Sequence, residues 1–178
     1  MNKKSFLTAS TLALAISTAT TAVYSAELEE IIVTAQKRAE SLQDVPISMS
    51  ALSGSTIKDN GIHSFQDLSG YVPNLEIAEN AVNTIITMRG IGIGSNQSFE
   101  QSVGIYVDGV HFGKSRQVRS GLFDVEQVEV LRGPQGILFG KNTLAGAINV
   151  TTASANVGDE FSGGIDVSQE SYNGQIVD

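Results

Sequence analysis

The sequence contains no cysteine, so its 178 residues cannot form a disulfide framework or a thiolate metal site. Its two histidines, His63 and His111, are too few and too far apart to indicate a zinc or iron centre, and no cofactor is expected. Three prolines against 18 glycines favour short turns over polyproline linkers. The formal net charge of −8 lacks the concentrated basic face that a phosphate backbone requires, which argues against a nucleic-acid partner.

The first residues have the three parts of a secretory signal. Lys3 and Lys4 form a positive start, an apolar and small-residue run covers 6–23, and Ser25 and Ala26 provide a small-residue exit. This order predicts a signal peptide over 1–25, with cleavage after residue 25 or 26. The alternative is a membrane anchor, which the repeated serine and threonine residues in the run disfavour.

The segment 26–40 that follows is short and flanked by charge. Its centre, Ile31–Thr34, consists of β-branched residues that favour an extended backbone. A terminal peptide of this kind suits strand addition to the exposed sheet edge of a partner. It could equally form the first strand of the following domain, and the residues alone do not decide between these alternatives.

Residues 41–154 predict one small α+β domain of short strands and short helices. A first short helix is expected from the capping residue Ser53 to Asn60, with Gly61 ending it in a left-handed conformation. A second is expected to start at the capping pair Ser64 and Asp67 and to stop at Pro73. A hairpin is indicated by Asp108-Gly109 between apolar runs. The expected strands cover 45–51, 75–78, 84–88, 104–107, 110–112, 128–131 and 147–152, and a helical turn is expected over 136–140.

The last stretch, 155–178, has a different pattern. Four residues at alternate positions, Phe161, Gly163, Ile165 and Val167, are separated by polar or small residues, as in a transmembrane β-strand. A turn at 173–174 would lead to a second strand, so we expect the start of a transmembrane barrel cut short at residue 178. The alternative is an edge strand of the small domain.

Six motifs occur in an order that resembles the TonB-dependent outer-membrane receptor family across essentially the whole chain after the leader. Each is weak alone, whereas six in order behind a signal peptide are specific. They are Glu30-Ile31-Ile32-Val33-Thr34-Ala35, similar to a TonB box; Leu42–Ser48; Asp67-Leu68 through Leu75; Met88-Arg89-Gly90-Ile91-Gly92; Val103–Gly109; and Val128–Gly136 continuing through Gly140 to Asn149.

The resemblance implies the plug of a transporter in the outer membrane of a Gram-negative bacterium. TonB would pair as a strand with the TonB box in the periplasm, and the plug would sit inside its own β-barrel. In the family, plug arginines form ion pairs with barrel glutamates, and the matching positions here are Arg89 and Arg132.

The resemblance also implies a small-molecule ligand, most commonly a ferric siderophore. Family plugs contact ligand through apical loops, which correspond to the polar stretches 95–101 and 111–116, each with one aromatic residue. The expected contact residues are Ser95, Asn96, Gln97, Phe99, His111 and Phe112. Vitamin B12, haem and glycans are carried by the same plug design.

Four alternatives to this function differ in how well they fit the sequence. A nucleotide-binding enzyme is disfavoured because Ser95 replaces the third glycine of a GxGxxG loop, and Gln135 and Asn142 break a phosphate-loop pattern. A free periplasmic binding module without a barrel is the main alternative, and a non-functional fragment is another. A signalling receptor is disfavoured, because family members of that kind carry an extra domain before the TonB box.

Overall fold

A computed structural model of the chain describes residues 30–34, 36–81, 83–94, 100–119, 121–154, 167–169 and 175–177. The chain divides into two units, Met1–Glu30 and Ile31–Asp178, and every described helix and strand belongs to the second. The predicted signal peptide lies outside the described residues and remains a prediction. Among the described residues, no helix has both the length and the apolar character needed to cross a membrane.

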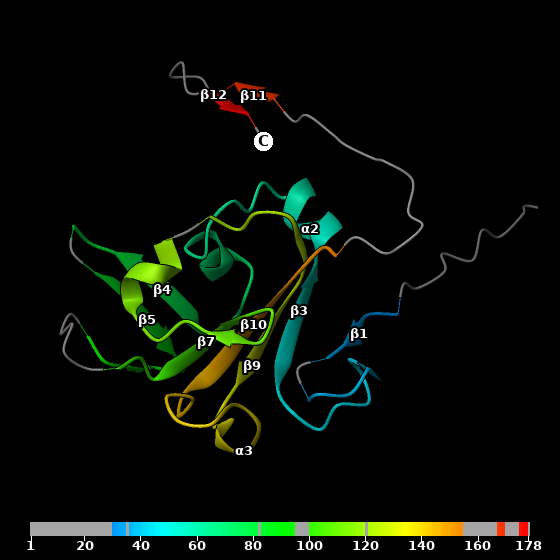
Figure 1. The fold of residues 1–178 in the computed structure, drawn as a ribbon, viewed down its shortest axis with the longest axis vertical. Helices are drawn as coiled ribbons and strands as arrows, with labels where there is room; N and C mark the ends of the chain where they lie inside the picture. Colours follow the sequence, from blue (N-terminus) through cyan, green and yellow to red (C-terminus); the bar gives the residue numbers. More distant parts are fainter. Residues whose placement is uncertain are drawn as a thin grey trace, which may run out of the picture. The chain divides into compact units, whose positions relative to one another are not determined.

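A mixed five-stranded sheet forms the centre of the domain, with the order β3-β9-β10-β7-β8 (Figure 1). β10 runs parallel to β7, and the other neighbouring pairs are antiparallel. The strands are β3 (Met49–Ser53), β9 (Val125–Arg132), β10 (Gly146–Thr152), β7 (Val103–Val107) and β8 (Val110–His111).

Smaller elements complete the domain. A second, antiparallel sheet contains β4 (Leu75–Glu79), β5 (Thr84–Met88) and β6 (Ile91–Gly92). The helices are α2 (Gly54–Asp59), α3 (Gly136–Phe139) and two 3-10 helices, η1 (Asp67–Gly70) and η2 (Ser115–Arg119). The predicted α+β fold is therefore confirmed.

The two faces of the central sheet carry different residues. Val128, Val130, Ile148 and Val150 are buried in the main core, together with residues of α2, η1, β4 and β5. On the opposite face, Leu131 and Ala147 belong to a smaller cluster with Tyr106 and Phe139. Side chains alternate across a strand, so β9 supplies residues to both clusters.

Local capping and turn signals proved reliable. The Ser53 side chain accepts a bond from the Thr56 amide, and Gly61 has a positive φ of 62°. Asp108 and Gly109 have φ values of 48° and 78°, and a two-residue type I′ hairpin turn requires positive φ at both of its central residues.

The capping pair before the second helix also forms. The Ser64 amide donates to Oδ2 of Asp67 at 2.8 Å, and the Asp67 amide donates to Oγ of Ser64 at 3.3 Å. The predicted capping turn is therefore present, but the helix itself, η1, begins only at Asp67, and it is a 3-10 rather than an α-helix.

The strand predicted over 45–51 lies later in the sequence than expected. The expected strand covered 45–51, but β3 begins at Met49 and continues to Ser53. Pro46 has no amide proton to donate to a neighbouring strand, which accounts for the late start. Val45 is nevertheless buried, so the apolar pattern of the segment reflects packing.

The last described residues form a short hairpin. β11 (Val167–Gln169) pairs antiparallel with β12 (Gln175–Val177), and Gln169 lies opposite Gln175. The turn predicted at 173–174 lies outside the described residues and remains a prediction. Residues 155–166 lie outside the described part of the chain, so the predicted barrel strand remains a prediction.

Gly146 provides a test of the packing between the two sheets. A Cβ at this position would lie 2.2 Å from Sδ of Met88 and 2.3 Å from the carbonyl oxygen of Leu131. We expect Gly146→Ala to destabilise the domain by about 1–3 kcal/mol, because a backbone carbonyl cannot move aside. Urea unfolding measures this change. Gly136→Ala is the matched control, since a Cβ there has no neighbour within 4 Å; equal midpoints for both variants would contradict the packing.

Candidate functional site

The predicted TonB-box segment is paired within the domain. β1 (Ile32–Val33) runs antiparallel to β2 (Glu40–Ser41), and the Leu42 amide donates to the carbonyl of Ile31 at 2.9 Å. Val33 is only 1% exposed, whereas Ile32 is 45% exposed. The alternative of a first strand within the domain thus describes this structure. The pairing also joins the two sides of the predicted boundary at residue 40.

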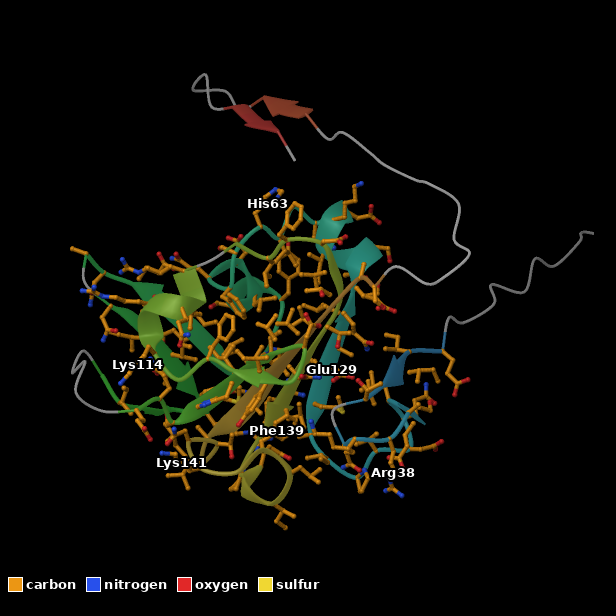
Figure 2. All side chains as sticks on the ribbon, viewed as in Figure 1. Arg38, His63, Lys114, Glu129, Phe139 and Lys141 are labelled. Carbon is orange, nitrogen blue, oxygen red and sulfur yellow. The ribbon has the colours of Figure 1, made fainter. Side chains whose placement is uncertain are left out.

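Two side chains of β9 bind the backbone of this segment. Nε2 of Gln127 donates to the carbonyl oxygen of Ile32 at 3.0 Å, and the amide of Thr34 donates to Oε1 of Glu129. Figure 2 labels Glu129 near the middle of the sheet. Its side chain is fully buried, and its other oxygen, Oε2, accepts a bond from Nδ2 of Asn149 at 2.8 Å.

Strand register explains why these groups meet. Asn149 on β10 lies directly opposite Glu129 on β9, and Tyr106 on β7 lies opposite Asn149. Residues opposite one another on neighbouring strands point to the same face of a sheet. The row therefore brings a carboxylate, an amide and a phenol onto the face that β1 approaches.

Further along the segment, Lys37 lies over the ring of Phe139, which packs against Tyr106. Nζ of Lys37 lies 5.4 Å from the centre of the Phe139 ring, within the range of a cation–π interaction. The ring of Phe139 lies 4.8 Å from that of Tyr106, whose hydroxyl donates to the carbonyl of Phe139. Burial raises the pKa of the Tyr106 phenol, so the phenol remains protonated and able to donate at neutral pH.

An open cavity of about 400 Å³ remains beside the segment. Lys37 and Arg38 supply positive charge to its wall, and Asp108 supplies a carboxylate. Arg38 also forms an ion pair of 3.1 Å with Glu40. Asp108 accepts bonds from the amide and the hydroxyl of Thr152, so these bonds already occupy both of its oxygens.

The two arginines predicted to contact a barrel lie close together. Arg89 and Gly90 form the turn between β5 and β6, with φ values of 52° and 78°. A Cβ at Gly133, next to Arg132, would lie 3.6 Å from Nη1 of Arg89. Burial lowers the pKa of Arg132, and the positive charge of Arg89 lowers it further.

Arg132 already has partners within the domain. Its Nε donates to Oγ of Ser48 at 3.1 Å, Nη1 to Oγ of Ser50 at 2.9 Å, and Nη2 to the carbonyl of Met49 at 3.0 Å. The guanidinium therefore fastens the first residues of β3 to β9. The predicted ion pairs with barrel residues remain a prediction.

The predicted substrate-contact residues fall into two groups. Ser95, Asn96, Gln97 and Phe99 lie outside the described residues, as does Ala35 of the predicted TonB box. His111 is exposed on β8, with its ring 5.1 Å from that of Tyr106. Phe112 is half-buried and packs against the main core, so only part of its ring could meet a ligand.

Sequence reasoning missed the residues that bind the segment. Glu129 is a carboxylate between two buried valines, Val128 and Val130, and such a placement signals a partner for a buried charge. Nothing local identifies that partner, because Thr34 is 95 positions away in the sequence. Among the described residues, no cluster of acidic residues and histidines could hold a metal ion.

Comparison with known proteins gives a consistent result. The TonB-dependent Receptor Plug Domain family matches residues 41–147. The chain is 33% identical over 125 residues to the pesticin receptor of Yersinia pestis, covering 68% of this chain and 18% of that receptor. It is 29% identical over 153 residues to the iron-regulated outer membrane virulence protein of Vibrio cholerae, covering 79% and 22%.

A solved structure shares the same fold. The ferric yersiniabactin uptake receptor FyuA of Yersinia pestis matches with a TM-score of 0.55 and 36% identity, over 61% of this chain and 17% of that one. The chain thus spans about a fifth of the length of the relatives it matches.

Replacing Arg132 tests its structural contacts. Lysine at this position keeps the charge but cannot donate at three separated points, so we expect Arg132→Lys to lower the free energy of unfolding by about 1–2 kcal/mol. Urea unfolding measures the loss, and hydrogen exchange at 48–50 locates it. Arg89→Lys is the control, because the Arg89 side chain is exposed at a turn. A loss as large in the control would contradict this role of Arg132.

Proposed function

The chain belongs to the TonB-dependent receptor plug domain family, and from this membership we propose that it is the plug of an outer-membrane receptor for energised nutrient uptake. The observation that carries the proposal is the family match over 41–147, which includes β3, β9, β7 and β8 of the central sheet and the first two residues of β10. Membership in a receptor domain family also confirms the prediction that the chain is not an enzyme.

A ferric siderophore is the proposed cargo. The names of two relatives support this choice, since one is iron-regulated and another takes up ferric yersiniabactin. The proposed contacts are Ser95, Asn96, Gln97 and Phe99, together with the exposed imidazole of His111 and the half-buried ring of Phe112. Within the complete receptor these residues would face the ligand from the plug.

TonB is the proposed partner of the segment 30–35. The backbone of Ile32 and Val33 is already extended in β1, as strand addition requires. TonB, driven by the inner-membrane proton gradient, would pair with this strand in the periplasm and pull on the plug.

The pair Arg89 and Arg132 is proposed to meet carboxylates of a surrounding barrel. Two neighbouring guanidiniums repel each other, so a carboxylate placed between them would gain from both charges. The burial of Arg132 and the charge of Arg89 beside it support this role.

Cell fractionation tests the proposal. An antibody against 45–150 should detect, in the outer membrane of native cells, a band several times larger than the 18.8 kDa of this chain. The family match predicts this size because the chain spans about a fifth of its relatives. A band near the size of the chain in the periplasm would favour the free binding module and would overturn the transport proposal.

A proline substitution tests the role of the segment. We expect Ile32→Pro to abolish TonB pairing, because proline has no amide proton to donate to a partner strand. Ligand binding should remain unchanged, since the ligand is proposed to bind elsewhere on the plug. Uptake of the labelled ferric siderophore and binding of it are measured separately in the complete receptor. Normal energised uptake by Ile32→Pro would contradict the role of residues 30–35.

A further inference from the structure

The two edges of β1 are occupied in different ways. In an extended strand the amide and carbonyl of one residue point to one edge, and those of the next residue point to the other. The carbonyl of Ile31 accepts from the Leu42 amide, so the odd-numbered residues face β2. The carbonyl of Ile32 and the amide of Thr34 therefore belong to the opposite edge.

Side chains, rather than a strand, occupy that opposite edge. Gln127 supplies a donor to the carbonyl of Ile32, and Glu129 supplies an acceptor for the amide of Thr34. A partner strand would have to supply the same donor and acceptor to the same two groups. Strand addition at this edge and the two side-chain bonds are consequently mutually exclusive.

Glu129 provides the stronger of the two bonds. Its carboxylate is fully buried and accepts from both Thr34 and Asn149. Hydrogen bonds to a carboxylate are shorter and roughly twice as strong as neutral ones. Gln127 is half-buried and makes a neutral bond, so it adds less.

We propose that Glu129, assisted by Gln127, is a positioning residue that retains the segment 31–34 on the plug. Its side chain competes with TonB for the edge of this segment that faces away from β2. The inference rests on the proposed function, since it assigns a means of regulation to the same TonB-binding segment. It implies that the strength of the bond from Thr34 to Glu129 sets how often the segment is available for pairing.

Hydrogen exchange at Thr34 in the complete receptor, without ligand, tests the retention. We expect the exchange rate to rise a few-fold in Glu129→Gln, which leaves at most a neutral acceptor. Glu129→Met keeps the volume and removes the acceptor, so the rise should reach roughly tenfold. Exchange at Val130 and Ile148 should stay unchanged, because both lie in the main core.

Two further variants separate this role from a general loosening of the domain. Glu126→Gln makes the same change of charge at an exposed position of β9 and should leave exchange at Thr34 unchanged. Gln127→Met removes the donor to Ile32 from a half-buried position, and it should raise exchange at Thr34 by a smaller factor. If the Glu129 variants also exchange faster at Val130, the test of retention is Gln127→Met: faster exchange at Thr34 in this variant supports the retention, and unchanged exchange overturns it.

Binding of the purified periplasmic domain of TonB provides the functional measurement. We expect the dissociation constant to fall by up to about tenfold in Glu129→Met and to stay unchanged in Glu126→Gln. A faster exchange at Thr34 with unchanged TonB affinity would overturn the competition. Unchanged exchange in the Glu129 and Gln127 variants would overturn the retention itself.

Failure of the proposed function would look different. If neither the native receptor nor any variant binds the TonB domain, while Ile32→Pro leaves uptake normal, the segment is not a TonB box. The assignment of Glu129 as a competitor of TonB would then fall as well. Binding by the native receptor with no effect of the Glu129 variants refutes only the further inference.

Discussion

A buried carboxylate that has to be satisfied is the constraint on which one whole face of the domain depends. Glu129 lies in the second strand of the central sheet, fully buried, and a carboxylate there is costly without hydrogen-bond donors. One donor is Asn149 on the next strand, and the other is the amide of Thr34 from outside the sheet. The second donor draws the N-terminal segment onto a sheet whose other face is already covered by the main core.

Local sequence patterns predicted much of this fold because their causes are local. Ser53 caps α2 through an amide three residues away, and Asp108-Gly109 closes its hairpin by its own φ values. The strand positions of β4 and β5 followed from alternation of apolar residues that are indeed buried. The start of β3 was predicted too early. The apolar alternation begins at Val45, before Pro46, whereas the strand begins only at Met49.

The candidate site was less predictable because its contacts join distant parts of the chain. The segment 30–35 and the arginines were located by motif, but the motif does not say what they touch. Arg132 contacts Ser48, Ser50 and Met49, more than 80 positions earlier in the sequence. Such pairings follow from the sheet order β3-β9-β10, which no local signal specifies.

β9 carries Gln127 and Glu129, which bind the N-terminal segment, and also Arg132 of the arginine pair. The N-terminal segment is attached less firmly than the neighbouring strands of β9. Five residue pairs join it to β3 and seven join it to β10, whereas two pairs join β1 to β2. Two side chains of β9 also hold this segment: Gln127 donates to the carbonyl of Ile32 in β1, and Glu129 accepts from the amide of Thr34, the residue after β1. A pull on the N-terminal segment would therefore break the attachments of β1 while the ladders of β9 stay intact. Because Arg132 is fastened to β3 separately, release of the segment would not require the arginine pair to move.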